Sequence, residues 1–434
     1  MRFPGWVEEA SRLHPTLSIG LTASIIRLVH ITFLYLLSWL IPPFDNSHNL
    51  VSSTSTNTPG LRWDAIHFIS IAKYGYIYEQ HLAFQPLFMG LLRLSGECLA
   101  WLKGNEFNEN DLIWGGMTIS STSWIGSCMI LHKMTTLLFN SSRFALLTTI
   151  LYMIPPTPIP SLPYTEPLYS LIVLSGIYLL VVKKQYILTG ILFAFSTATR
   201  ATGIFNVFIL AGVIILGDLP IHRIGVKLLI ERLMTRSWKA IIPCLITMLP
   251  FLLSQWYAYQ SFCDDQGITS NEMRRPWCDT KLPFVYHFVQ KEYWNIGFLN
   301  YWTIANIPNI LLPLPIIITS FLGIINHFKS LKNHLSNQTS ILTILYLHHV
   351  LILFLVLFNS HIQILLRTCI TDPVIWWNVT SISINWGKDK SVEKEKLTSK
   401  KRIQLTKIGK IWISWCLIWG TLSTILWIGH YPPA

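Results

Sequence analysis

The segment YILTGILFAFSTATRATGIFNVFILAGVIIL, residues 186–216, carries a single charged residue, Arg200, at its centre. Basic residues flank this segment, at Lys183–Lys184 and within 222–239. Because basic connectors of membrane proteins stay in the cytosol, both ends of the segment should face the same side. The chain must then turn back near Arg200 in two arms of roughly 15 residues, whereas about 20 residues cross a bilayer. A charged side chain in such a place is a candidate for function, since it needs a partner or water.

The rest of the 434-residue chain has the same apolar character. Hydrophobic residues make up 51% of it and charged residues 12%, about half of the ~25% typical of soluble domains. The mean hydropathy is +0.45. The sequence predicts an all-α polytopic membrane protein with about ten to twelve transmembrane helices. Besides 186–216, the apolar runs are Leu17–Ile41, Ala83–Leu102, Leu112–Leu131, Phe144–Ile159, Leu168–Val182, Ala240–Tyr259, Ile304–Ile325, Ile341–Phe358, Ile370–Ile384 and Ile411–Ile428.

The polar segments between these runs sort by charge. We expect one integral membrane domain over residues 1–434, with a basic cytosolic loop at about 387–410. The same rule predicts a first luminal loop at about 42–82 and a second at about 260–300. Cys263 and Cys278 share the second loop, where they form either a disulfide or two free thiols.

The early chain needs one run that does not cross. If every run before Lys183 crossed once, this basic residue would lie in the lumen. The loop after Ala83–Leu102 is acidic, whereas Lys133 and Arg143 flank a basic one. We therefore expect Ala83–Leu102 to be the irregular run.

The charge pattern excludes several classes of function. The formal net charge is +12, but the basic residues lie mostly in connectors and form no basic face with interleaved aromatics, so nucleic acid is not an expected partner. The sequence contains no phosphate-binding glycine loop and no HExxH motif, and its seven cysteines show no zinc spacing. We predict membrane lipids as partners, and no metal or cofactor.

The first candidate constellation is Arg62-Trp63-Asp64-Ala65-Ile66-His67-Phe68. Asp64 and His67 are three residues apart and would share one face of a helix. A partly dehydrated carboxylate near aromatic rings can act as a general base, and Trp63 could contact substrate. Asp45, in the same expected loop, is a reserve base. The alternative is an interfacial helix with Asp64 as a cap and His67 in solvent.

Two further segments place charge at apolar runs. Tyr164 could contact substrate, and Glu166 lies between two prolines at the mouth of a run, which would hold its carboxylate in a fixed place. The alternative is a helix N-terminus, where Glu166 is favoured by the helix dipole. The guanidinium of Arg200 suits a phosphate. The alternative for Arg200 is a structural salt bridge, to Glu166 for example.

The remaining candidates belong to expected luminal loops. Trp294 and Asn295 lie in an aromatic segment with few charges, which suits a sugar- or lipid-binding rim or an ordinary interfacial belt. His361, Gln363 and Arg367 follow an apolar run and could line the same cavity, or be solvated loop residues.

Taken together, these segments resemble the PIG-V family of GPI mannosyltransferases. The family pattern W-D-A-x-H-F is matched by Trp63–Phe68, and its A-F-F-P segment by Ala83–Pro86, with Gln85 in place of the second Phe. Its P-Y-S/T-E and A-T-x-R-x-x-G segments are matched by Pro163–Glu166 and Ala198–Gly203. The W-N-x-G-F and P-N segments also match, at Trp294–Phe298 and Pro308–Asn309, so the resemblance covers nearly the whole chain.

The resemblance implies a GT-C-like glycosyltransferase of the endoplasmic reticulum membrane, with a luminal cavity formed by the first luminal loop. The donor would be dolichyl-phosphate mannose and the acceptor the mono-mannosylated GPI precursor. The second mannose would be added in α-1,6 linkage with inversion, with a small accessory membrane subunit as a possible partner. Asp64 would be the base, and His67 would support Asp64 or contact the phosphate. Arg200 would stabilise the leaving phosphate, and Glu166 would orient Arg200 or bind acceptor hydroxyls.

Two alternatives stay open at this point. One is another transferase that uses lipid-linked sugars, in an N-glycan or a different GPI step. The other is a lipid or solute transporter, which would be expected to show internal repeats and paired broken helices. The sequence contains one plausible broken helix and no repeat.

Overall fold

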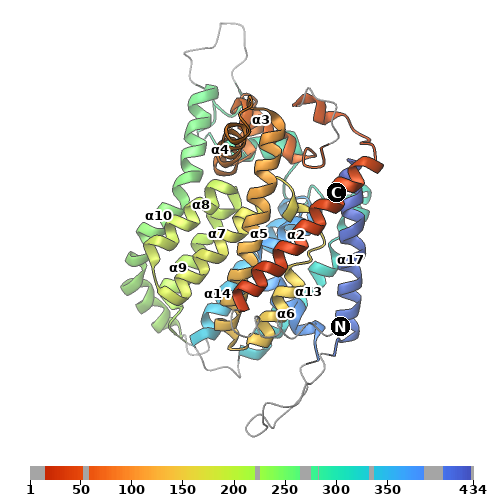
Figure 1. The fold of residues 1–434 in the computed structure, drawn as a ribbon. Helices are drawn as coiled ribbons and strands as arrows, with labels where there is room; N and C mark the ends of the chain where they lie inside the picture. Colours follow the sequence, from red (N-terminus) through yellow and green to blue (C-terminus); the bar gives the residue numbers. More distant parts are fainter. Residues whose placement is uncertain are drawn as a thin grey trace.

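The computed structural model describes residues 15–51, 58–219, 225–263, 275–281, 283–331, 337–385 and 404–431. Helices dominate this part of the chain, and its β-structure is one isolated bridge between Ile384 and Leu405 (Figure 1). The α-helices are α2 (Pro15–Leu40), α3 (Asp64–Tyr74), α4 (Pro86–Lys103), α5 (Glu109–Phe139), α6 (Ser142–Tyr152), α7 (Thr165–Tyr178), α8 (Tyr186–Thr199), α9 (Asn206–Leu216), α10 (Val226–Cys263), α11 (Val285–Trp294), α12 (Ile307–Leu311), α13 (Leu314–Ser330), α14 (Asn337–Asn359), α15 (Leu365–Thr368), α16 (Pro373–Ser383) and α17 (Lys407–Ile428).

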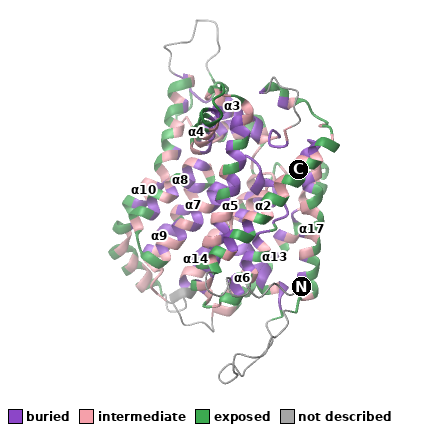
Figure 2. Ribbon diagram, viewed as in Figure 1, coloured by how far each residue is buried: buried purple, intermediate pink, exposed green. Residues whose placement is uncertain are grey.

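The bundle has α5 and α7 at its centre. Helices α8, α9 and α10 pack on one side of this pair, and α2 and α17 lie on the other (Figure 1). Burial follows the same order. In the apolar stretch of Thr165–Lys183, which is α7 and its π-helical end, 61% of residues are buried, against 22% in α10. Exposed residues accordingly gather on α10 and α17 (Figure 2), as expected for helices whose outer faces meet lipid.

The all-α polytopic architecture is confirmed. Within the described residues, five helices are long and apolar enough to cross a membrane, and a sixth crossing is possible as a bent pair. Several other apolar helices are shorter than a full crossing, including α8 and the 201–216 arm. The expected ten to twelve crossings remain a prediction. The five helices are α2, Thr165–Lys183, α10, Ser340–Asn359 and α17.

Two boundaries differ from those expected. The run Ile304–Ile325 is bent by 68° between Leu311 and Leu314, because Pro313 lacks the N–H that a continuous helix needs. Helix α10 begins at Val226 and continues through basic residues that we expected in a loop. Its first turns are rich in Leu, Glu, Arg and Met, which are good helix formers, so charge alone did not end the helix.

The chain reverses at Arg200, as predicted. Residue Arg200 has extended backbone angles between α8 and the 3₁₀ turn η5 (Ala201–Phe205). Beyond the turn, the side-chain amide of Asn206 donates to Ser196 Oγ at 2.9 Å. Gly203 lies against the backbone of α8, and a Cβ there would be 2.5 Å from the amide nitrogen of Thr197. Only glycine allows this close approach.

Short elements cover one end of the bundle, drawn at the top of Figure 1. Helix α3 lies there, and α4 is seen nearly end-on across the bundle rather than along it (Figure 1). This orientation agrees with our expectation that Ala83–Leu102 is the irregular run. The end of α10 reaches the same level, where Cys263 and Cys278 form a disulfide. The first of the two alternatives for these cysteines is therefore the one observed.

Candidate active site

A cavity of about 920 Å³ lies under these short elements. Its walls come from the start of α3, the segment before α4, α7, the α8–η5 turn, α11, α14 and the stretch 359–374. Of the candidates from the sequence, the side chains that line it are Trp63, Asp64, Arg200, Trp294, His361, Gln363 and Arg367. Segments far apart in the sequence thus meet around one space.

A chain of four charged side chains forms the polar part of the site. Arg367 Nη1 lies 2.6 Å from Asp64 Oδ2, and Arg367 Nε lies 3.5 Å from Glu166 Oε1. Arg200 Nη1 lies 2.8 Å from the same Glu166 oxygen. Two guanidinium groups alternate with two carboxylates, so the formal charges of the chain cancel.

The exposure of these groups differs. Asp64, Arg200 and Arg367 are 29%, 20% and 21% exposed, whereas Glu166 is completely buried. The first three can therefore contact a ligand in the cavity. Glu166 cannot, and it acts from behind by holding both arginines. The salt bridge from Arg200 to Glu166 is thus observed. Arg200 can also contact a ligand, because 20% of its side chain is exposed.

Local backbone structure fixes the two carboxylates. Trp63, directly before α3, has φ 52° and ψ −130°, a strained conformation that costs about 1–3 kcal/mol and is common at functional sites. Asp64 is then the first residue of α3. Glu166 lies in the first turn of α7, and Ser120 of α5 bonds both the N–H and the carbonyl of Tyr164 just before it. Both carboxylates therefore lie at helix N-termini, which favour negative charge.

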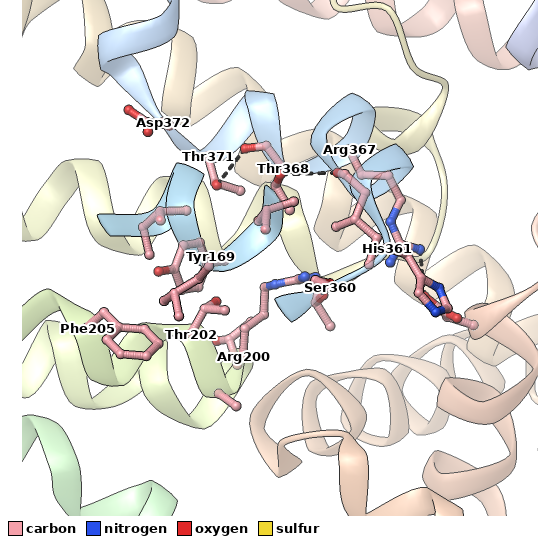
Figure 3. Close-up of a pocket in the computed structure, with 18 of the residues that line it drawn as sticks. Tyr169, Arg200, Thr202, Phe205, Ser360, His361, Arg367, Thr368, Thr371 and Asp372 are labelled. Carbon is pink, nitrogen blue, oxygen red and sulfur yellow. Dashed lines mark hydrogen bonds and ion pairs between the residues drawn. The ribbon is translucent and has the colours of Figure 1, made fainter. Parts of the chain in front are cut away.

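The two arginines are held by different neighbours. Arg200 Nη1 also donates to Thr165 Oγ1 at 2.7 Å. The guanidinium of Arg367 stacks over the Tyr164 ring, 5.5 Å from its centroid. Figure 3 shows Arg200 reaching from its turn toward the wall that carries Ser360, His361 and Arg367. Both guanidiniums thus retain N–H groups toward the cavity, an arrangement suited to a phosphate.

The protonation states follow from these contacts. Burial raises the pKa of the Asp64 carboxyl, but Arg367, His67 and Arg200 together lower it further, so this pKa lies below its ordinary value. Burial lowers the pKa of His67, and the nearby Asp64 only partly offsets this effect. At neutral pH the site holds an ionised Asp64 and a neutral His67.

Aromatic rings form one wall of the cavity. Phe84 and Trp294 line it and contact one another, with ring centroids 5.9 Å apart. His67 packs against both rings and is not among the described residues that line the cavity. It can support Asp64 only through the α3 helix and its electrostatic field. His361 donates to the Trp294 carbonyl at 2.9 Å and so joins this wall to the Arg367 segment.

A buried carboxylate ties this wall to the disulfide. Glu79 accepts hydrogen bonds from the Trp277 indole at 2.6 Å and from the Tyr293 hydroxyl at 2.7 Å. Trp277 directly precedes Cys278 of the disulfide, and Tyr293 precedes the wall residue Trp294. The disulfide and these two hydrogen bonds therefore fix α11 over the segment that leads to Phe84.

Some predicted site residues lie elsewhere. Asp45 is exposed and pairs with His430, 3.7 Å away, outside the cavity. Asn295 is exposed at the end of α11, where its backbone has φ 51°. Tyr164 is buried beneath Arg367 and takes part only through that contact.

A second ionisable pair, which was not predicted, includes one residue of the cavity wall, Asp372. Asp372 Oδ2 lies 2.6 Å from Nδ1 of the buried His349, and Asp372 Oδ1 caps α16 by accepting from the Val374 amide. Figure 3 places Asp372 at the opposite end of the cavity from His361. Both residues lie in expected apolar runs, so the rule applied to Arg200, that a charge in a membrane segment marks function, would have found them.

The comparisons with known proteins agree on one family. The family model described as Mannosyltransferase (PIG-V) matches residues 36–434. "GPI mannosyltransferase 2" from Cryptococcus neoformans var. neoformans serotype D (strain B-3501A) is 39% identical over 434 residues, covering 98% of this chain and 100% of that protein. The protein of the same name from Schizosaccharomyces pombe (strain 972 / ATCC 24843) is 30% identical over 75% of this chain and 65% of its own length.

A mammalian relative and a solved structure are also similar. "GPI alpha-1,6-mannosyltransferase 2" from Cricetulus griseus is 28% identical over 73% of this chain and 71% of that protein. The apo crystal structure of the Archaeoglobus fulgidus oligosaccharyltransferase aligns with a TM-score of 0.46 at 12% identity, over 96% of this chain and 56% of that one. The family model and the full-length relative decide the assignment: this chain is a mannosyltransferase of the PIG-V family.

Proposed function

We propose that this enzyme transfers mannose from dolichyl-phosphate mannose to the mono-mannosylated GPI precursor, in α-1,6 linkage, at the luminal face of the endoplasmic reticulum membrane. The names of the relatives support the GPI step and the linkage. The observation that carries the mechanism is the cavity that brings the carboxylate of Asp64 together with the guanidiniums of Arg200 and Arg367. These are the groups that a single displacement at a sugar phosphate needs.

The proposed step is an in-line displacement at the anomeric carbon of the donor mannose. The 6-hydroxyl oxygen of the acceptor mannose forms the new bond to this carbon as the bond to the phosphate oxygen breaks. The hydroxyl proton passes to Asp64, and the electron pair of the broken bond stays on dolichyl phosphate. The β-linked donor gives an α-linked product, so the configuration inverts. Asp64 suits the role of base because it is ionised and partly exposed to the cavity.

The two arginines act on the leaving group. The donor is a phosphodiester with one negative charge, and the departing dolichyl phosphate gains a second charge as the bond breaks. Guanidiniums at this position therefore bind the transition state more strongly than the bound donor. Glu166 holds Arg200 at 2.8 Å and Arg367 at 3.5 Å, and so positions both without contacting substrate.

The lower part of the cavity is apolar and suits the lipid part of the donor. Its lining includes Val173 and Ile177 of α7, Ile209 of α9, and Leu355 and Val356 of α14. A polyprenyl chain could lie along these side chains while its phosphate reaches Arg200. We propose that the reaction needs no metal, because guanidiniums can neutralise the phosphate. The small accessory membrane subunit stays a prediction.

Product analysis tests the proposal directly. The protein, purified in lipid nanodiscs, is incubated with a synthetic polyprenyl-phosphate mannose and the mono-mannosylated precursor. We expect a dimannosylated lipid that an α-1,6-specific mannosidase converts back to the acceptor, and we expect cells depleted of the protein to accumulate the precursor with one mannose. A different linkage, or normal precursors after depletion, would exclude this reaction.

The side of the membrane needs its own test. In a background with the exposed Cys98 changed to Ser, Arg200→Cys should react with an impermeant thiol reagent only when the reagent has access to the lumen. The Cys98→Ser parent serves as the control for labelling of the other thiols. Labelling of intact, sealed microsomes from the cytosolic side would contradict the luminal orientation.

A further inference from the structure

Gln85 is a buried amide without a hydrogen-bond partner. The residue is 2% exposed and lies in the cavity wall between Phe84 and the first turn of α4. Neither its side-chain nitrogen nor its side-chain oxygen has a partner among the described residues. It occupies the N-cap position of α4, yet its side chain makes no capping bond.

Such an amide has no evident structural purpose at this position. Buried polar groups are nearly always hydrogen-bonded, because burial removes the bonds they would make with water. A methionine or leucine would fill the same volume of wall without this loss. An unsatisfied amide at a cavity wall is therefore better explained by a ligand than by the fold.

A second unsatisfied donor lies in the same wall. The indole Nε1 of Trp63 is buried without a partner, and Trp63 also lines the cavity, directly before Asp64. Gln85 supplies two N–H donors and one carbonyl acceptor, and Trp63 one N–H donor. The neighbouring rings of Phe84 and Trp294 add apolar surface. Hydroxyl groups, which both donate and accept, on a ring with apolar C–H faces complement this set.

We propose that the Gln85 amide hydrogen-bonds a hydroxyl of the sugar that reacts at Asp64, and so helps to determine which sugar the enzyme accepts. The inference rests on the proposed function, because that function places a sugar beside Asp64. The amide atoms are covered in the free enzyme, so the side chain turns into the cavity when the sugar binds. The sugar is either the transferred mannose or the acceptor mannose, and the experiment separates the two.

The test compares Gln85→Met with the matched control Gln80→Met. Met keeps the length of the side chain and removes the amide; Gln80 precedes the same wall and does not line the cavity. We expect Gln85→Met to leave thermal stability unchanged or raised, since it removes an unsatisfied polar group. We expect kcat/KM to fall on the order of tenfold, as for a lost hydrogen bond to substrate. Gln80→Met should keep both values.

Deoxy substrates identify the hydroxyl. Each hydroxyl of the donor mannose, and then of the acceptor mannose outside the reacting position, is replaced by hydrogen. The analogue that lacks the bonded hydroxyl should have a lower kcat/KM than the natural substrate with the wild type. With Gln85→Met, the analogue and the natural substrate should have the same kcat/KM. Coupling with a donor analogue assigns the transferred mannose, and coupling with an acceptor analogue assigns the acceptor.

The possible failures are distinguishable. Full activity in Gln85→Met would overturn the role of Gln85 while the proposed reaction stands. So would a result in which Gln85→Met lowers kcat/KM by the same factor with every deoxy analogue as with the natural substrate. If the wild type transfers no mannose, the proposed function fails. In that case the amide is tested by binding alone: the rise in melting temperature that each mannosyl lipid causes is compared between the wild type and Gln85→Met. Equal rises would overturn the role of Gln85. If Gln85→Met does not fold, Gln85→Leu gives the same comparison.

Discussion

Replacing Asp64 by Asn separates its role as a base from its role as a partner of Arg367. The substitution keeps the size of the side chain and its place at the start of α3. It removes the carboxylate that would accept the proton, and loss of a general base typically costs about 100- to 10,000-fold in rate. We therefore expect kcat of Asp64→Asn to fall by at least about 100-fold.

Asp64→Asn should lower the free energy of unfolding only slightly, and it should not weaken binding of the donor. Breaking a fully buried ion pair costs about 3–5 kcal/mol. Asp64 and Arg367 are 29% and 21% exposed, and Arg367 keeps Glu166 at 3.5 Å, so we expect only about 1–2 kcal/mol. Asp64 also competes with the donor phosphate for Arg367. Its removal should leave the KM for donor unchanged or lower.

The assay is radiolabelled mannose transfer in nanodiscs, with the melting temperature measured on the same samples. Asp45→Asn is the matched control: it changes the same residue type in the same expected loop, but Asp45 is exposed and lies outside the cavity. This control should keep wild-type activity. A kcat for Asp64→Asn within about threefold of wild type, or a comparable loss in Asp45→Asn, would refute Asp64 as the base.

Three further predictions concern the same site and its cover. Arg200→Ala should lower kcat more than it raises the KM for donor, because its guanidinium stabilises charge that develops on the leaving phosphate; Arg200→Lys should restore part of kcat, and unchanged kinetics in both would reduce Arg200 to a structural role. Because the pKa of Asp64 lies below its ordinary value, and an ordinary Asp carboxyl has a pKa of about 3.9, the base stays ionised in mildly acidic solution. We therefore expect kcat/KM to stay flat down to about pH 5. Because burial places the pKa of His67 below the ordinary histidine value of about 6.5, a fall between that value and about pH 5 would point to His67 as the base. Changing both Cys263 and Cys278, 15 positions apart, to Ser should cost about 3 kcal/mol of stability, and an unchanged melting temperature would exclude the disulfide as a support of the site.

Much of the site could be predicted because charge is scarce in this chain. Where few ionisable residues interrupt apolar runs, those few mark the polar cavity, and Asp64, Arg200 and Arg367 all line it. The sequence did not predict that Asp64 pairs with Arg367. Asp64 and Arg367 are 303 positions apart, and nothing local predicts that they meet. The resemblance suggested roles but not contacts.

The errors have physical reasons as well. Spacing placed His67 on the same face as Asp64, and the two interact electrostatically, but the His67 ring packs against Phe84 and Trp294 and does not itself line the cavity. Helix boundaries were set by single residues, such as Pro313 at the bend after α12. These outcomes depend on tertiary packing, which a one-dimensional pattern does not contain.

The balance of charge in the Asp64–Arg367–Glu166–Arg200 chain has a consequence for inhibitor chemistry. Positively charged sugar mimics are effective where an enzyme presents surplus carboxylates to an oxocarbenium-like centre. Here both carboxylates are already matched by guanidiniums, so a cationic mimic would gain little from the site. A stable phosphonate that carries a mannose-shaped group on a lipid chain should compete more strongly, because it brings the anion that the two arginines can accept.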